Sequence, residues 1–252
     1  MHIEHISISR EQTWNECQAK YRFRYHLKVI PEGPVPIYLT FGKIVHKVIE
    51  EHSRNKGEIP LAKITKEILA GNIELEPGLK APKLEPEYKN KLVKHLEHYS
   101  RLVEKIGYDG EIEWKFKIDM DGKGRCMTGF IDRIIRKDDS FFLLDWKTTK
   151  PSFWRKDSRT ITKDLQLQCY CYVVWKEFNV SPKNIQAALM FLDDNKLVPV
   201  RFSEKTLQSV PERLLKVYKE IENMPPDHVY GNVGAHCSRC DYAKQCVFYK
   251  TN

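Results

Sequence analysis

The 252-residue chain has no run that is long and apolar enough to cross a bilayer. Its first twelve residues, MHIEHISISREQ, lack the apolar segment of a secretory signal peptide. We therefore expect a cytoplasmic protein with no membrane partner. Disulfides are rare in that compartment, so we expect the seven cysteines to bind metal or to be buried as free thiols.

The chain also lacks internal repeats, low-complexity linkers and the G-x-x-x-x-G-K-[ST] loop, which excludes a nucleotide-driven motor of that type. Positive charge, in contrast, is abundant: the formal net charge is +8 and the sequence pI is about 9.0. This balance favours a polyanionic partner, because lysine and arginine release counterions when they bind phosphates. A soluble basic protein with no such partner would have the same balance.

The hydrophobic pattern predicts an α/β protein with a helical N-terminal part and a mixed sheet. Helices are expected at residues 7–27, 41–54, 164–178 and 203–223, and across 60–106 with a loop at 77–87. Strands are expected at 111–119, 124–136, 140–150, 185–193 and 197–202. We expect one domain, 1–252, with a mainly helical part (1–110), a sheet core (111–202) and a helix followed by a cysteine-bearing tail (203–252).

Two carboxylates and a lysine are brought together by the predicted strands. Asp145 and Lys147 are two residues apart in the apolar strand SFFLLDWK, so their side chains project to the same face. Asp132 lies on the preceding strand, which a tight turn at KDD would bring alongside. Carboxylates suit a hard cation such as Mg²⁺, and Lys147 could orient or deprotonate a water or offset charge on phosphorus. Taken singly, such residues are more often solvated.

The order GFIDRI, LLDWKTT and QLQCY resembles the RecB-type branch of the PD-(D/E)xK nuclease superfamily. The resemblance implies a restriction-endonuclease-like fold. It also matches Gly42 and His46, in FGKIVHKVIEE, to a Gly-x-x-x-His pattern on an upstream helix. The catalytic residues that it implies are Asp132, Asp145, Lys147, Gln166 and Tyr170; the implied ligands of Mg²⁺ or Mn²⁺ are His46, Asp132, Asp145 and the carbonyl of Trp146.

Three of these assignments have alternatives. The family often has a glutamate on the first core strand, for which Glu113 is the nearer candidate and Glu111 the second. Gln168 and Tyr172 repeat the spacing of Gln166 and Tyr170, although the Gln-Leu-x-x-Tyr form selects the latter pair. Without the other motifs, His46 would be interpreted as an exposed or packed side chain.

The C-terminal tail carries three closely spaced cysteines in HCSRCDYAKQC, with little apolar sequence around them. Such spacing indicates a metal site, which needs a fourth ligand. The resemblance extends to superfamily members with an iron–sulfur cluster, and implies a C-terminal [4Fe–4S] region with the ligands Cys17, Cys237, Cys240 and Cys246. Structural zinc is the alternative, since thiolate spacing alone does not reject it. Cys126, Cys169 and Cys171 are assigned to packing.

Two segments interleave basic and aromatic residues: 20–25 and 153–156. Such stretches suit single-stranded nucleic acid, on whose bases aromatic rings stack. Residues 20–25 could instead pack around the cysteine site. Separately, Thr148 and Thr149, which follow Lys147, could donate hydroxyls to a DNA backbone.

The resulting expectation is a metal-dependent DNA nuclease, an exonuclease on single-stranded or free ends, similar to CRISPR-associated exonucleases and the AddB nuclease domain. Its setting would be DNA repair, recombination, phage DNA processing or CRISPR adaptation. A helicase, or a recombination or adaptation protein, would be a separate partner. The alternative is a DNA-binding or redox-sensing protein, with iron–sulfur or zinc, whose nuclease site is inactive.

Overall fold

The computed structural model describes residues 3–32, 36–148, 157–225 and 230–249. The chain divides into two compact units, each built from segments that are distant in the sequence. Unit 1 comprises Met1–Val35, Lys115–Gly129 and Gln208–Asn252, and unit 2 comprises Pro36–Trp114 and Phe130–Leu207.

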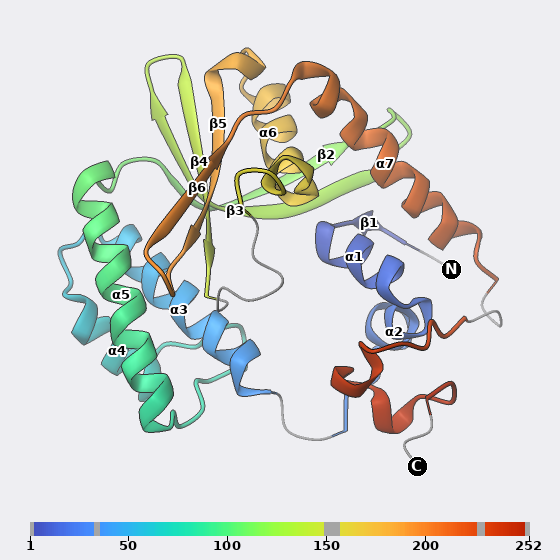
Figure 1. Ribbon diagram of the computed structural model, residues 1–252, viewed down its shortest axis with the longest axis horizontal. Helices are drawn as coiled ribbons and strands as arrows, with labels where there is room; N and C mark the ends of the chain where they lie inside the picture. Colours follow the sequence, from blue (N-terminus) through green and yellow to red (C-terminus); the bar gives the residue numbers. More distant parts are fainter. Residues whose placement is uncertain (1–2, 33–35, 149–156, 226–229, 250–252) are drawn as a thin grey trace. The chain divides into compact units, whose positions relative to one another are not determined.

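The described strands form one six-stranded mixed sheet of order β1-β3-β4-β5-β6, with β2 also paired to β3 (Figure 1). The pairs β1–β3 and β4–β5 are parallel, whereas β3–β4 and β5–β6 are antiparallel. The strands are β1 (His5–Ile6), β2 (Glu111–Asp119), β3 (Cys126–Lys137), β4 (Ser140–Lys147), β5 (Ile185–Phe191) and β6 (Lys196–Val200). The predicted α/β class with a mixed sheet is confirmed.

The hairpin between β3 and β4 sets the register of the predicted site. Lys137 pairs with Ser140, and the loop residue Asp138 has φ 53, a left-handed conformation that aspartate tolerates better than most residues. At the other end of the ladder Arg133 pairs with Leu144. The next residues along the two strands are Asp132 and Asp145, so the hairpin brings these carboxylates to neighbouring positions.

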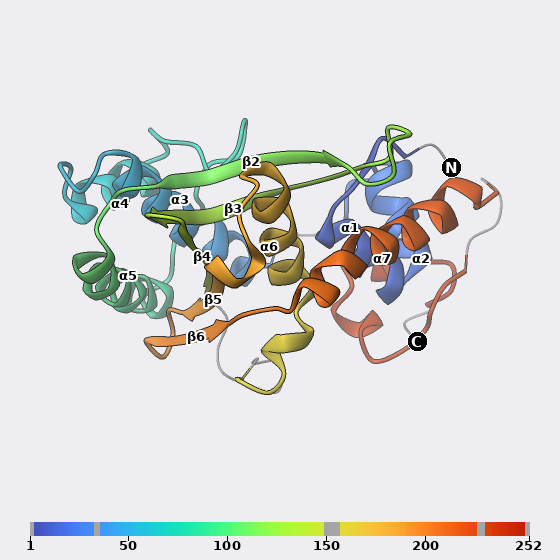
Figure 2. The ribbon, with the colours of Figure 1, turned by 90° about the horizontal axis from the view of Figure 1, so that it is seen from above.

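Helices cover both faces of β4 and β5 in unit 2 (Figures 1 and 2). Helices α3 (Ile37–Arg54), α4 (Leu61–Leu69) and α5 (Pro86–Ile106) share a buried apolar cluster with Leu144, Trp146, Ala188 and Met190. Residues alternate across a strand, so Asp145 and Lys147 point to the opposite face. Helix α6 (Leu165–Glu177) packs on that face, and the Asp164 carboxylate caps it by accepting a bond from the Leu167 N–H.

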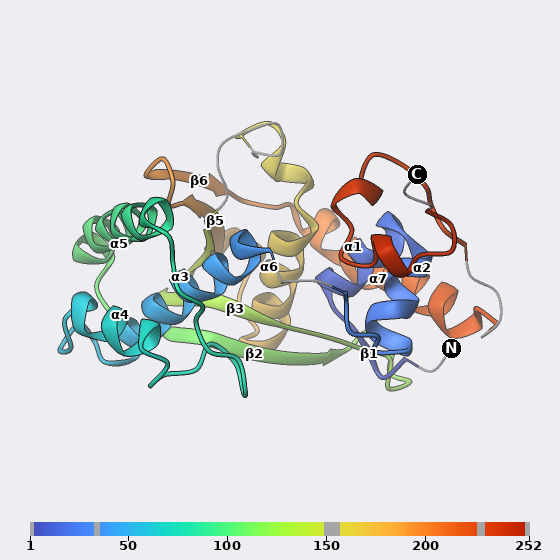
Figure 3. The ribbon, with the colours of Figure 1, turned by 90° about the horizontal axis from the view of Figure 1, so that it is seen from below.

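Unit 1 joins the two ends of the chain (Figure 3). It contains α1 (Ile8–Glu16), α2 (Gln18–Tyr21), a π-helical turn (Arg22–His26) and most of α7 (Glu204–Asn223). The Tyr218 hydroxyl donates to the Ile3 carbonyl at 2.7 Å, and the Trp14 indole donates to Glu220 at 3.1 Å. Short 3₁₀ turns lie at Ile161–Lys163 and Pro182–Asn184 in unit 2 and at Cys237–Arg239 and Ala243–Gln245 in unit 1.

The expectation of one continuous helix over residues 7–27 is wrong. Cys17 has φ −164 and ψ 118, an extended conformation that ends α1, and the chain resumes in α2 and then in a π-helical turn. Such turns are frequent at functional sites. Among the described helices, none combines the length and the apolar character that a bilayer span requires.

Candidate metal centre and active site

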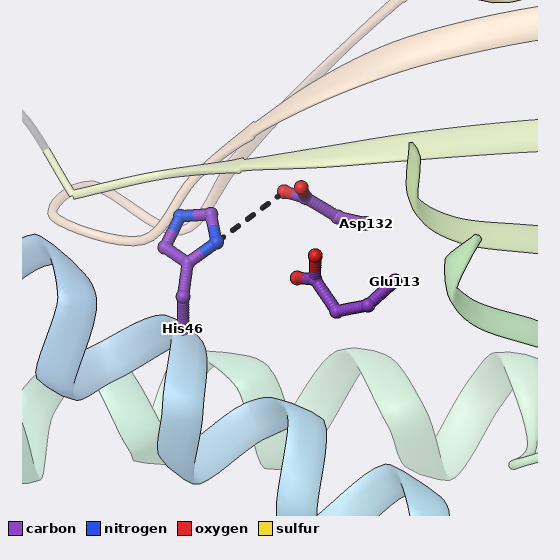
Figure 4. Close-up of side chains that lie close together, drawn as sticks. All are labelled: His46, Glu113 and Asp132. Atoms are coloured by element: carbon purple, nitrogen blue, oxygen red, sulfur yellow. Dashed lines mark ion pairs between the residues drawn. The ribbon is translucent and has the colours of Figure 1, made fainter. Parts of the chain in front are cut away.

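Three side chains from three elements of unit 2 converge on one point: His46 from α3, Glu113 from β2 and Asp132 from β3 (Figure 4). One ligand atom of each lies within 4.8 Å of the other two. His46 Nδ1 is 3.6 Å from Asp132 Oδ2. An imidazole and two carboxylates at this spacing form a donor set that a divalent cation can occupy.

Glu113 joins this site through an irregular backbone. Its φ is 49, which is uncommon for a residue other than glycine and unusual within a strand. Irregular strand positions of this kind re-aim side chains and are frequent beside active sites. Burial, and next the charge of Asp132, raise the pKa of Glu113 to about 7. Glu111, the second candidate, is exposed and outside the group.

Asp132 is tied to the main chain of β4. Its Oδ2 accepts a 2.7 Å hydrogen bond from the Trp146 N–H, while the Trp146 carbonyl lies 3.0 Å from His46 Nε2. Burial, followed by the charge of Asp145, raises the pKa of Asp132 well above its usual range. Burial is also the main cause that lowers the pKa of His46. The site therefore crowds acidic groups at low solvent exposure, a costly arrangement that a cation would relieve.

Asp145 and Lys147 form an ion pair, with Lys147 Nζ 2.6 Å from Asp145 Oδ2. This contact confirms that the two side chains share a face of β4. Asp145 is only 2% exposed. Burial alone would lower the pKa of Lys147, but the negative charges of Asp145, Asp132 and Asp164 outweigh it and raise that pKa. The lysine is held as an ammonium ion beside the carboxylates.

Helix α6 continues this polar chain. Lys147 Nζ donates to Gln166 Oε1 at 3.1 Å, and Gln166 Nε2 donates to the Tyr170 hydroxyl at 2.7 Å. The alternative pair lies elsewhere, because Gln168 donates to the Thr162 carbonyl and Tyr172 packs against Trp175. The structure thus connects Gln166 and Tyr170, the pair that the Gln-Leu-x-x-Tyr form selects, to the lysine.

At the glycine of the Gly-x-x-x-His pattern, α3 comes close to Thr148, the residue that follows β4. A Cβ on Gly42 would lie 3.3 Å from Thr148 Oγ1. Gly42 and His46 are four apart, so they share one helix face along β4. Thr149 and residues 153–156, for which DNA contact was predicted, lie outside the described residues.

One pocket in unit 1 is lined by the four cysteines Cys17, Cys237, Cys240 and Cys246. No three of their sulfur atoms lie within 4.8 Å of one another, although all four belong to the described part of the chain. The other three cysteines, Cys126, Cys169 and Cys171, are buried and lie outside this pocket, in agreement with their assignment to packing.

The aromatic residues of segment 20–25 pack within unit 1. Tyr21 contacts Trp14 and Tyr25, with ring centroids 5.3 and 5.0 Å apart, respectively. Phe23 packs on Tyr242 at 5.4 Å and lines the cysteine pocket. Of the two interpretations of this segment, packing around the cysteines accounts for these contacts.

A family model described as the PD-(D/E)XK nuclease superfamily matches residues 5–247. The chain belongs to this superfamily. It is therefore a phosphodiester-hydrolysing nuclease of a group that acts on DNA with divalent metal ions, and the predicted family is confirmed. No curated protein matches the chain.

The solved structures that match the chain include the following two crystal structures. One is of a protein from Eubacterium rectale that is named as an exonuclease; it is 14% identical with a TM-score of 0.58, and the match covers 99% of this chain and 90% of that one. At this identity the likeness shows the shared fold. The other, of SSO0001, is 16% identical over 92% of this chain and 95% of that one, with a TM-score of 0.38.

Proposed function

We propose that this nuclease is an exonuclease that degrades single-stranded DNA from its ends, with Mg²⁺ or Mn²⁺ at the centre in unit 2. The observation that carries the proposal is the convergence of His46, Glu113 and Asp132 within 4.8 Å. Asp145 and the Trp146 carbonyl are the remaining proposed ligands. The Trp146 N–H and carbonyl contact Asp132 and His46, respectively, so the main chain of β4 is bonded to two of the proposed ligands.

The donor set fits the proposed cation in its chemistry. Carboxylate and carbonyl oxygens are the ligands that Mg²⁺ and Mn²⁺ prefer, and a single imidazole is compatible with Mn²⁺. When bound, a cation of this kind polarises the scissile phosphate and lowers the pKa of a water molecule. The buried carboxylates of Asp132 and Asp145 would lose their mutual repulsion at the same time.

Lys147 is the proposed catalytic cation of the protein itself. Because nearby carboxylates raise its pKa, it is present as an ammonium ion, which suits orienting the attacking water and stabilising negative charge on the phosphate. Gln166 would hold the ammonium group through the 3.1 Å bond, and Tyr170 would hold Gln166 in turn. These two residues fix the position of the lysine before DNA binds.

Exonuclease action is supported by the Eubacterium rectale protein named as an exonuclease, which shares the fold over nearly the whole chain. The net charge of +8 supports a nucleic-acid substrate. The proposed setting is the cytoplasm, in DNA repair, recombination, phage DNA processing or CRISPR adaptation. The chain has no G-x-x-x-x-G-K-[ST] loop, so a helicase of that type would be a separate partner.

The cysteine pocket is proposed to hold a [4Fe–4S] cluster. Four thiolates fit either this cluster or zinc in their chemistry. That all four cysteines line one pocket supports a single shared site, and zinc stays the alternative occupant. The proposed role is structural, since the ligands join the first and last segments of unit 1.

The test is digestion of end-labelled single-stranded DNA with Mn²⁺ or Mg²⁺, with Asp145→Ala as the control. Release of mononucleotides or short products by the wild type only is the expected result. Substrates blocked at the 5′ or the 3′ end then give the polarity. Equal inertness of wild type and variant, with DNA binding retained, would favour an inactive binding module instead. Iron and sulfide analysis, with the visible absorption spectrum, separates the cluster from zinc.

A further inference from the structure

Two buried histidines lie on α5, outside the metal centre. His95 is fully buried and His98 is 9% exposed, and as neighbours three apart they share one helix face. Both meet the segment that directly follows β5. Neither His95 nor His98 belongs to the group formed by His46, Glu113 and Asp132.

His98 is linked to the catalytic strand by a short chain of hydrogen bonds. Its Nδ1 lies 2.5 Å from the Leu192 carbonyl, and since a carbonyl only accepts, Nδ1 carries the proton. The Leu192 N–H in turn donates to the Lys147 carbonyl at 2.9 Å. Leu192 is fully buried. The bond between Leu192 and Lys147 continues the main-chain contact of β4 and β5 just beyond the pair Lys147–Phe191.

The neighbouring residue is held in a similar way. His95 Nε2 lies 3.3 Å from Asp193 Oδ1, and the Lys91 ammonium group is 4.0 Å from the same oxygen. Burial lowers the pKa of His95 to about 4, so His95 is neutral at pH 7 and donates through Nε2–H. Asp193 is buried as well. Two histidines of helix α5 thus bond to two successive residues, Leu192 and Asp193.

A cluster whose only task was to fill space would be better made of apolar side chains. Buried polar groups cost free energy unless they are bonded, and in return they specify one geometry. Here the geometry that is specified is the end of β4, where Lys147 carries the proposed catalytic ammonium. Trp146, whose carbonyl is a proposed metal ligand, immediately precedes it.

We infer that His98 and Asp193 are positioning residues, which hold the main chain of Lys147 through Leu192 and thereby set the register of the lysine and of the Trp146 carbonyl. This inference rests on the proposed roles of those two residues. Misplacing a catalytic group by about 1 Å costs on the order of a hundredfold in rate.

The experiment compares His98→Leu with His98→Asn. Leucine removes the donor, whereas the asparagine amide nitrogen can occupy the place of Nδ1. For His98→Leu we expect kcat to fall about 10- to 100-fold with little change in KM. We also expect the Mn²⁺ dissociation constant of this variant, measured by electron paramagnetic resonance, to rise about tenfold. Amide hydrogen exchange at Leu192 should speed up. His98→Asn should recover all three quantities. Asp193→Asn, which keeps an acceptor for His95, should likewise exceed Asp193→Ala in kcat.

If His98 only stabilised the fold, the measurements on His98→Leu would differ from those expected above. If His98→Leu lowers the melting temperature but keeps the kcat and the Mn²⁺ affinity of the folded enzyme, the inference is overturned. Should His98→Leu fail to fold, the same measurements on Asp193→Asn and Asp193→Ala test the positioning role instead. If the wild type cleaves no DNA, the proposed function fails, whereas Mn²⁺ affinity and Leu192 exchange still test the positioning.

Discussion

Replacing Glu113 by glutamine removes one negative charge from the centre without changing the size of the side chain. One ligand atom of Glu113 lies within 4.8 Å of one of Asp132. Two charges at that distance repel by about 3.5 kcal/mol at an effective dielectric constant of about 20. Raising the pKa of Glu113 from its ordinary 4.5 to about 7 corresponds to roughly 3.4 kcal/mol. Because Glu113 is partly exposed, we expect about 2 kcal/mol after solvent screening.

The direction in which pH changes the stability follows from proton binding to Glu113. Between pH 4.5 and about 7 the folded protein keeps a proton on Glu113 that the unfolded chain releases, so this group makes folding less favourable as the pH rises through that window. Above that pH window, Glu113 destabilises the folded protein to its full extent. In EDTA at pH 8, Glu113→Gln should therefore melt about 4–8 °C above the wild type, and the difference should shrink near pH 4.5.

Mn²⁺ should reverse the order of the melting temperatures of Glu113→Gln and the wild type. A cation that binds only the folded wild type raises its melting temperature, while the variant has lost one ligand and gains less. The assay is thermal unfolding with EDTA and with Mn²⁺, with Glu111→Gln as the matched control from the same strand. A Glu113→Gln protein that is no more stable in EDTA and gains as much from Mn²⁺ as the wild type would refute the reasoning.

Three further predictions follow from the same structure. Lys147→Ala should reduce cleavage at least a thousandfold and leave single-stranded DNA binding nearly unchanged, and near-normal turnover would remove the lysine from the mechanism. Cys17→Ala should lower both the melting temperature and the bound iron, whereas Cys126→Ala, outside the cysteine pocket, should keep the iron; equal iron in both variants would contradict the ligand assignment. DNA affinity should fall steeply between about 50 and 200 mM salt, and a flat salt dependence would argue against phosphate contacts as its main source.

Much of the sheet and of the centre was predictable because the signals are local. The strands around Asp132 and Asp145 have strong apolar patterns and a short turn, and the observed bounds of β2 are those predicted. The side of β4 on which Asp145 and Lys147 lie follows from strand alternation alone. For the same reason, the link between Gln166 and Tyr170 follows from helical spacing.

Features that depend on tertiary contacts were missed. Strand β1 has two residues and exists only through its pairing with β3. The break at Cys17 separates α1 from α2 although the local sequence is compatible with one helix. The left-handed backbone of Glu113, which selects it over Glu111, has no signal in its neighbours. His98 could not be connected to Lys147 either, since 49 positions separate them in the printed sequence.

The most direct measurement is an anomalous difference map from crystals soaked in Mn²⁺, compared for wild type and His46→Ala. We predict a peak about 2.0–2.3 Å from donor atoms of His46, Glu113, Asp132 and Asp145, beside the Lys147 ammonium group, and a weakened peak in the variant. A peak at another place, or one unchanged when His46 is removed, would contradict this prediction.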